Sequence, residues 1–280
     1  RGDWSSDVCS SDLNLEVWAV LRDFHGGINS YEETYEVLSH TSKRTQVINQ
    51  VIAAALETGV DGINLDFELI STECGEHYIQ FVRELSVRCR QNGLVFSVDN
   101  YVPQPYNEHY DIEEQGAVAD YVVIMGYDEH TEGSYEAGSV ASISYLENGI
   151  TDALNDVPAE KLIAGIPFFT RLWFETPKTE EELAQEQGTE AASYPNSVSS
   201  YAYGMNDAAD IVSQAGVQAE WDDTTKQNYA QWDADGGTYK IWLEDGQSLE
   251  EKLKVIKSNN LAGVAEWSLG MEDTSVWDLI

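Results

Sequence analysis

The stretch Asp61-Gly-Ile-Asn-Leu-Asp-Phe-Glu68 decides the fold, and it lies within a strand predicted over 60–69. Successive side chains of a strand point to opposite faces, so Ile63, Leu65 and Phe67 share one apolar face. The opposite face carries only small or polar residues: Gly62, Asn64, Asp66 and Glu68. Two carboxyl groups on one face repel each other, and burying them is costly unless they have a use. The pair suits a chemistry in which one carboxyl stays protonated near neutral pH while its neighbour is charged.

Around this strand, β-rich runs alternate with segments of helical periodicity, which indicates parallel βα units and an α/β fold. Strands are predicted over 15–21, 60–69, 94–102, 119–127, 161–169 and 261–267. Helices are predicted over 45–58, 76–92, 111–118, 139–154 and 249–258, with a long loop after the first strand. The segment 170–247 is too long for an ordinary βα loop. It includes a predicted hairpin over 229–243 and is interpreted as a small α+β insertion.

The composition limits the classes of partner. The 280 residues are 42% hydrophobic and 11% aromatic, enough for a sizeable core, and the net charge is −35. Such acidity argues against binding to nucleic acid or to anionic membranes. It indicates a well-solvated surface or, alternatively, electrostatic steering of a cationic substrate. No apolar run approaches the ~18 residues that a membrane-spanning helix needs.

Cysteine and histidine carry little functional signal. Cys74 and Cys89 lie near opposite ends of the predicted helix 76–92, about 22 Å apart at the helical rise. A disulfide cannot span that distance. No metal-ligand spacing is present, and no nucleophile elbow supports a Ser-His-Asp triad. The sequence therefore predicts neither a metal nor a cofactor.

The opening octapeptide resembles the signature of glycoside hydrolase family 18, the chitinase and N-acetylglucosaminidase family, written Asp-Gly-x-Asp-x-Asp-x-Glu. Asn64 stands in place of the middle acid, a departure shared by the bacterial spore-cortex and cell-wall glucosaminidases. The first predicted strand also lacks the Ser-x-Gly-Gly of many chitinases, which favours the cell-wall branch. The resemblance runs from about residue 14 to residue 280. It implies a TIM (β/α)8 barrel.

The resemblance also implies that the barrel is incomplete. The motif strand is the fourth in the family, so the six predicted strands would be strands 3 to 8 of an N-terminally truncated barrel, 14–280. The segment 1–13 resembles the translation of a sequencing adapter and is expected to be non-native; a native Ser/Asp-rich linker is the alternative. Two missing strands would expose sheet edges, so this stretch alone is expected to fold poorly and to be inactive. The intact protein is expected to be a monomer.

The resemblance assigns roles to the motif carboxyls. Glu68, at the carboxyl end of the strand, would be the general acid that protonates the glycosidic oxygen. Asp66 would hydrogen-bond the acetamido N–H of the substrate and stabilise an oxazolinium ion, because this family uses the substrate's own amide as nucleophile. Asn64 would be a neutral support. The alternative is that the pair only makes a salt bridge or cap at the end of the strand.

Two further motifs contribute to the implied site. The stretch Met125-Gly-Tyr-Asp128 resembles the family's Met-x-Tyr-Asp. Met125 and Tyr127 would point inward, Tyr127 would donate to the acetamido carbonyl, and Asp128 would contact a sugar hydroxyl. Trp267 would form a floor on which a pyranose stacks, with a core tryptophan as the alternative. The family often has a cis peptide after this tryptophan, here between Trp267 and Ser268.

Three more residues follow predicted strands and would line the cleft: Tyr101, Arg171 and Trp173. Plain surface packing is equally compatible with their positions. The resemblance implies hydrolysis of β-1,4 bonds in GlcNAc-containing glycans, peptidoglycan or chitin, by substrate-assisted retaining catalysis. A non-catalytic, chitinase-like sugar-binding protein is the alternative function. An extracellular or cell-wall location is inferred from the substrate class alone.

Overall fold

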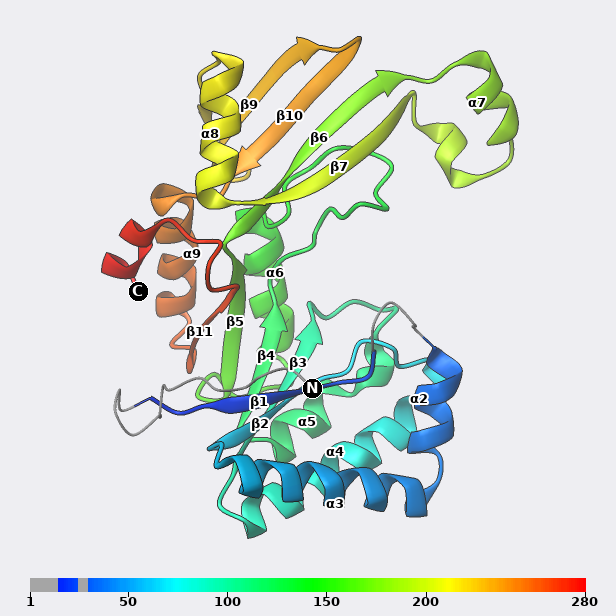
Figure 1. Ribbon diagram of the computed structural model, residues 1–280, viewed down its shortest axis with the longest axis vertical. Helices are drawn as coiled ribbons and strands as arrows, with labels where there is room; N and C mark the ends of the chain where they lie inside the picture. The colour runs from blue at the N-terminus through cyan, green and yellow to red at the C-terminus, as the bar shows by residue number, and fades with distance from the viewer. Residues whose placement is uncertain (1–14, 25–29) are drawn as a thin grey trace. The chain divides into compact units, whose positions relative to one another are not determined.

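A computed structural model describes residues 15–24 and 30–280, so the expectation for 1–13 lies outside the described residues. The chain divides into two compact units. The first extends to Ile124 and includes Ala153–Leu162, and the second comprises Met125–Asp152 and Ile163–Ile280. In Figure 1 the first unit is coloured mainly from blue to green, and the second from green to red.

The first unit contains parallel strands and the helices that connect them. Its strands are β1 (Trp18–Arg22), β2 (Gly62–Asp66), β3 (Val95–Tyr101) and most of β4 (Tyr121–Met125). The β1–β2 and β2–β3 pairs are parallel. The connecting elements are α2 (Tyr31–Leu38), α3 (Thr41–Thr58), η1 (Thr72–Cys74), α4 (Gly75–Gln91), η2 (Glu108–Tyr110) and α5 (Ile112–Val118). Helices α3 to α5 lie along one side of the strands (Figure 1).

The apolar face of the motif strand packs on helix α4, as its alternation predicts. Ile63 and Leu65 are buried, and the Phe67 ring stacks on Phe81 with ring centroids 5.6 Å apart. Strand β2 ends at Asp66, however, so Glu68 lies in the turn beyond the strand rather than inside the predicted range 60–69. The carboxyl group is therefore positioned by the turn as well as by the strand.

Close packing on the inner face of the sheet leaves no room for a side chain at Gly62. It pairs in register with Trp18 of β1. A Cβ at position 62 would lie 2.8 Å from the Trp18 ring and 2.9 Å from the Val95 carbonyl oxygen. The Trp18 ring crosses this space and stacks on Tyr121 with centroids 5.7 Å apart. The motif glycine thus leaves room for an aromatic pair below the carboxyl residues.

Helix α2 was predicted to be part of a long loop, and that prediction is wrong. The helix covers Tyr31–Leu38 and begins at Ser30, whose hydroxyl accepts a hydrogen bond from the Glu33 N–H. Only Thr34 and Leu38 of this helix are buried, so the sequence carries too few apolar positions to show helical periodicity. The N-terminal cap was the remaining signal for this helix.

The second unit contains a parallel strand pair and an antiparallel sheet. All but the first residue of β5 (Leu162–Pro167) belongs to it, and β5 pairs in parallel with β11 (Gly263–Trp267). The second unit also contains α9 (Gly246–Ser258), η4 (Thr274–Asp278) and most of α6 (Ile143–Ala153). Each of the six predicted parallel strands therefore has a counterpart in β1 to β5 and β11, with ends that differ by a few residues.

The predicted insertion is an antiparallel sheet with strand order β7-β6-β10-β9-β8. The strands are β6 (Phe169–Pro177), β7 (Asn196–Gly204), β8 (Glu220–Asp222), β9 (Gln227–Ala234) and β10 (Gly237–Leu243). The predicted hairpin is confirmed as β9 and β10. The helical elements are α7 (Glu180–Gln185), η3 (Glu190–Ser193) and α8 (Met205–Ala215), and α8 packs against the sheet through Ala208 and Val212. Strand β6 starts at Phe169, so the predicted strand 161–169 runs slightly too far.

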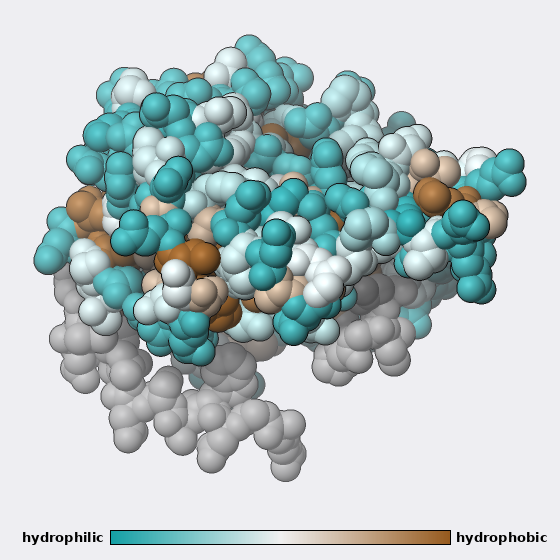
Figure 2. Space-filling model, turned by 90° about the horizontal axis from the view of Figure 1, so that it is seen from above, coloured by the Kyte–Doolittle hydropathy of each residue, from teal (hydrophilic) through white to brown (hydrophobic). Residues whose placement is uncertain are grey.

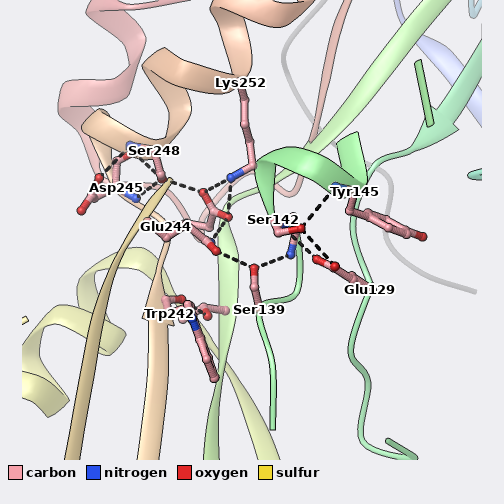
Figure 3. Close-up of polar contacts among 12 residues, drawn as sticks. Glu129, Ser139, Ser142, Tyr145, Trp242, Glu244, Asp245, Ser248 and Lys252 are labelled. Carbon is pink, nitrogen blue, oxygen red and sulfur yellow. Dashed lines mark hydrogen bonds and ion pairs between the residues drawn. The ribbon is translucent and has the colours of Figure 1, made fainter. Parts of the chain in front are cut away.

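A buried polar cluster joins the insertion to helix α9, as Figure 3 shows. The Glu244 carboxylate accepts hydrogen bonds from Lys252 Nζ at 2.8 and 3.0 Å, from Gln227 Nε2 at 2.6 Å and from Ser248 Oγ at 2.7 Å. Both charged side chains are almost fully buried. Gln227 in turn accepts a hydrogen bond from Ser139. This cluster links β9, β10 and α9 within the second unit.

Hydrophilic side chains dominate the face in Figure 2, and apolar residues are scattered on it. That agrees with the solvated acidic surface indicated by the net charge of −35. Within 15–24 and 30–280, none of the helices combines the length and hydrophobicity needed to cross a bilayer.

Candidate active site

Three adjacent parallel strands of the first unit bring acidic residues to their carboxyl ends. Asp66 is the last residue of β2, and Glu68 follows it. Asp23 directly follows β1, and Asp99 lies near the end of β3. Active sites of α/β barrels form at this end of the strands. The position of these carboxyls therefore matches a candidate active site.

Glu68 is held at both its side chain and its backbone. The Tyr101 hydroxyl donates a hydrogen bond of 2.8 Å to Glu68 Oε2. The backbone N–H groups of Glu68 and Leu69 donate to Asp23 Oδ1 and Oδ2, at 3.0 and 2.8 Å. Asp23 therefore fixes the turn that carries Glu68. Burial raises the pKa of the Asp23 carboxyl, although the two backbone N–H groups oppose the change.

Asp66 is the most buried of the three acidic residues in the motif, with 7% of its surface exposed. Its Oδ2 lies 3.5 Å from Arg22 Nε, whereas its Oδ1 is buried and accepts no hydrogen bond from any residue that the structure describes. Burial, and then the neighbouring Glu68, raises the pKa of Asp66 to about 6, while Arg22 acts in the opposite direction. A carboxyl group with this pKa changes charge in the range where many hydrolases work.

Asp99 is a second carboxyl with a raised pKa. Asn64 Nδ2 donates to Asp99 Oδ1 at 2.8 Å and to Ser97 Oγ at 2.9 Å, so the motif asparagine bridges β2 and β3. Burial raises the pKa of Asp99 to about 7; the Asn64 hydrogen bond opposes the rise, and the charges of Asp66 and Glu68 add to it.

This arrangement favours mixed protonation near neutral pH. Four carboxyl groups lie close together, and among residues 15–24 and 30–280 Arg22 is the cation that contacts one of them. Burial and nearby like charges oppose the simultaneous ionisation of Asp23, Asp66 and Asp99. The site can thus hold a proton on one of these carboxyls while another carries a negative charge. Nowhere in the part of the chain that the structure describes are three His, Cys, Asp or Glu side chains grouped to hold a metal ion.

The second unit carries the six other predicted site residues, and four of them lie at or just after the ends of β4 and β11. Met125 is the last residue of β4, and Tyr127 packs edge-on against Phe169 with ring centroids 6.1 Å apart. Asp128 has a left-handed backbone conformation, with φ 59°. Trp267 ends β11 and is 47% exposed, and its peptide bond to Ser268 is cis, as the resemblance implied.

Arg171 and Trp173 lie on β6 of the insertion. Arg171 Nη1 donates to Ser200 Oγ on β7 at 3.0 Å. Trp173 is fully buried, and its Nε1 donates to the Gly138 carbonyl oxygen at 2.8 Å. The expectation that Trp173 lines an open cleft is therefore corrected: a ring without exposed surface cannot stack on a sugar. It is a core residue of the second unit.

The structure brings together Asp66, Glu68 and Tyr101 in the first unit. Sequence reasoning missed three residues beside them: Arg22, Asp23 and Asp99. A signal for Asp99 was present, because strand alternation places it on the same face as Ser97 and Tyr101. Arg22 and Asp23 gave a weaker signal, since only the parallel register reveals which residues they meet.

Several known proteins are similar to this chain. The putative sporulation-specific glycosylase YdhD of Bacillus subtilis is 27% identical over 90% of this chain and 57% of its own length. The cortical fragment-lytic enzyme of the same organism is 26% identical over 95% of this chain and 60% of its own length. The chain thus spans less than two thirds of the length of these curated relatives.

Solved structures show the same fold. The spore cortex-lytic enzyme SleL of Bacillus megaterium QM B1551 matches with a TM-score of 0.80 and 21% identity, over 96% of this chain and 60% of that one. A chitinase of Chromobacterium violaceum ATCC 12472 matches with a TM-score of 0.81 and 24% identity, over 96% and 80%. The strands and helices described above fit a partial TIM-like α/β fold. The model of the family "Glycosyl hydrolases family 18" matches residues 21–272, and this chain belongs to that family.

Proposed function

We propose that the protein is a glycosidase that hydrolyses β-1,4 bonds in GlcNAc-containing glycans, with peptidoglycan as the first candidate and chitin oligomers as the second. The observation that carries the proposal is the pairing of Glu68 with the buried Asp66 at the end of β2. Family membership supports glycan hydrolysis. Relatives named for spore-cortex lysis and for chitin support the two substrate candidates.

In the proposed mechanism, Glu68 donates a proton to the glycosidic oxygen of the leaving sugar. The Tyr101 hydroxyl restricts the carboxyl by its hydrogen bond to Oε2, and Asp23 restricts the backbone on which it stands. After the leaving group departs, the same carboxylate takes a proton from the attacking water, by microscopic reversibility. Precise placement of the acid makes both transfers effective.

The nucleophile in this proposal is the substrate's own 2-acetamido oxygen, and the reaction proceeds with net retention. Asp66 would accept a hydrogen bond from the acetamido N–H and stabilise the oxazolinium ion. That role needs the ionised carboxylate, which predominates above the Asp66 pKa of about 6. Arg22 favours this charged form, because it stands 3.5 Å from Oδ2.

Residues of the second unit complete the proposal. Tyr127 would donate to the acetamido carbonyl, and Asp128 would contact a sugar hydroxyl. Met125 would form part of the inner wall, and the half-exposed Trp267 would stack on a pyranose face. Tyr101 and Arg171 are further candidates for sugar contacts. No role with the substrate is proposed for Trp173.

We also propose where and how the enzyme works. A glycan of the cell wall requires extracellular or wall-associated action, and the cortical fragment-lytic relative is consistent with that location. The protein is proposed to act as a monomer, and the residue roles above use neither metal nor cofactor.

The test is release of a reporter group from a GlcNAc oligomer by the protein at its natural length. Glu68→Gln keeps the size of the side chain but removes the transferable proton, so kcat should fall by about 10²- to 10⁴-fold. Glu73→Gln is the matched control, because Glu73 is exposed on η1 five residues away, and it should retain activity. Equal turnover by Glu68→Gln and the unmodified protein would remove Glu68 from its role.

The same experiment separates the alternative function. A non-catalytic, chitinase-like sugar-binding protein would bind GlcNAc oligomers without turnover, and Glu68→Gln would not change its behaviour. Hydrolysis of cortex-type peptidoglycan and of chitin oligomers in parallel reactions then decides between the two substrates. A single β-anomeric product at early times, observed by proton NMR, is expected from net retention.

A further inference from the structure

One oxygen of the central acid lacks a hydrogen-bond donor. Asp66 Oδ2 faces Arg22, but Asp66 Oδ1 is buried and has no partner among the described residues. A buried acceptor without a donor is unfavourable, and native sites usually supply one. The donor should lie on the inner face of the sheet, next to the carboxyl end of β2.

Asp99 occupies that place on the neighbouring strand. The parallel register pairs Asn64 with Ser97 and Leu65 with Val98, so continuing it by one residue places Asp99 next to Asp66. Strand alternation puts Asp99 on the same face as Ser97. The Asn64 amide donates to Asp99 Oδ1 at 2.8 Å, which leaves the other carboxyl oxygen to carry a proton. A protonated carboxyl can accept one hydrogen bond and donate another.

We propose that Asp99 is a positioning residue that keeps a proton and donates a hydrogen bond to Asp66 Oδ1, so that Asp66 is held in its charged form. The Asn64 amide orients Asp99 for this contact, which gives a function to the asparagine in place of the motif's middle acid. The kinetic consequence rests on the proposed glycosidase function, whereas the protonation of Asp99 does not.

The electrostatics agree with this assignment. Burial raises the pKa of Asp99 to about 7, above the value of about 6 for Asp66. Between these values Asp66 is mostly charged and Asp99 is mostly neutral. The other titratable or charged groups that act on the pair are Arg22 at the end of β1, Asp23 after β1, Glu68 after β2 and Tyr78 on α4. Tyr101 on β3 and Tyr110 on η2 lie beside Glu68 and Asp23.

Kinetics of two substitutions test the hydrogen bond. Asp99→Asn keeps both an acceptor for Asn64 and a donor for Asp66, so kcat should fall only about 3-fold, as for the loss of a fraction of one hydrogen bond. Its activity should extend to higher pH, because the amide cannot ionise. Asp99→Ala removes the donor, and kcat should fall by about 30-fold or more with little change in KM. Ser97→Ala is the control, because it removes the hydroxyl group that also accepts a hydrogen bond from Asn64 and leaves every titratable group in place.

Stability against pH tests the proton without using activity. A carboxyl whose folded-state pKa is raised contributes stability below its unfolded pKa, near 4, and loses that contribution as pH rises through the folded value. For Asp99 the loss falls between about pH 4 and about pH 7. The melting temperature of the unmodified protein relative to Asp99→Asn should therefore decrease across this window. The same difference for Ser97→Ala should stay constant.

The two readouts separate the possible failures. A difference in melting temperature that does not vary with pH would overturn the proposal, because Asp99 would then not hold a proton. Loss of activity in Asp99→Asn equal to that in Asp99→Ala would overturn it too, because a neutral donor would not suffice. Absence of glycosidase activity in the unmodified protein, together with the expected pH dependence of stability, would sink only the proposed function.

Discussion

At the scale of a single residue, Arg22 favours the charged form of Asp66. Its Nε lies 3.5 Å from Asp66 Oδ2 and lowers a pKa that burial and Glu68 raise. No sequence motif identifies Arg22; its importance follows from its register opposite Asp66.

Replacing Arg22 by Gln should move the acid limb of the pH–rate profile to higher pH. The limb reports ionisation of Asp66, with a midpoint near its pKa of about 6. Loss of a nearby positive charge makes the carboxylate less favourable, and about 1 pH unit is expected because Arg22 is partly exposed. The measurement is kcat/KM from pH 4 to 8. Arg88→Gln, a surface change on α4, should leave the limb in place, and an unmoved limb in Arg22→Gln would contradict the assignment.

Asp23 acts on the catalytic acid through the backbone. Its two carboxylate oxygens accept the N–H groups of Glu68 and Leu69. In Asp23→Asn one of these acceptors becomes a donor that faces an N–H group, so the turn must shift.

We expect Asp23→Asn to lower kcat by about 10- to 100-fold with a smaller effect on KM, because a displacement of about 1 Å at a reacting group costs that much. Steady-state kinetics at a pH well above 6 measures the effect apart from the titration of Asp66. Asp61→Asn is the matched control at the other end of β2, where a single N–H from Val17 meets the carboxylate and an amide oxygen can replace it. Similar kcat values for both variants would show that Asp23 does not position Glu68.

At the scale of elements, the buried cluster around Glu244 joins helix α9 to the insertion strands. Lys252 is 1% exposed and makes two hydrogen bonds to Glu244 (Figure 3). Burial raises the pKa of Glu244 even with Lys252 beside it. The cluster therefore depends on both partners being present.

Lys252→Met should destabilise the protein by about 3–5 kcal/mol, because it leaves a buried carboxylate without its counter-ion. The free energy of unfolding in urea measures this loss. Lys254→Met on the same helix is the control; its ion pairs with Glu250 and Glu251 are exposed, so the loss of stability should be much smaller. Adding Glu244→Gln to Lys252→Met should restore part of the stability. Equal losses of stability in Lys252→Met and Lys254→Met would show that the cluster around Glu244 does not depend on Lys252.

At the scale of the whole molecule, strand β1 is an edge. It pairs with β2, and no strand among residues 15–24 and 30–280 pairs with its other side. Val17 and Val20 are 44% and 58% exposed. A row of unpaired backbone groups next to apolar side chains is a template for association with another chain.

The stretch 14–280 expressed alone should therefore self-associate and unfold with low cooperativity, and we propose that it would be inactive in this form. Light scattering after size-exclusion chromatography over a range of concentrations measures the association. Val20→Lys should weaken it, whereas Val87→Lys, at an exposed position on α4, should not. A cooperative, active monomer at all concentrations would contradict this expectation.

Much of the fold could be predicted, because short apolar runs alternate with helical periodicity along the chain. The parallel strands, the hairpin and the buried face of the motif strand follow from this pattern. Helix α2 could not be found in the same way, since only two of its residues are buried. The burial of Trp173 was equally hidden, because a tryptophan after a predicted strand looks the same in a cleft and in a core.

The sequence by itself determined the pair of acids, Asp66 and Glu68, and the strand that leads to them, because all are encoded within eight consecutive residues. Only the tertiary structure decided which groups surround the pair. Arg22, Asp23 and Asp99 come from other strands, and parallel pairing brings them to the same end of the sheet. The charge of a carboxyl depends on burial and on neighbours within a few ångströms, and these are distances in space that spacing along the chain does not specify.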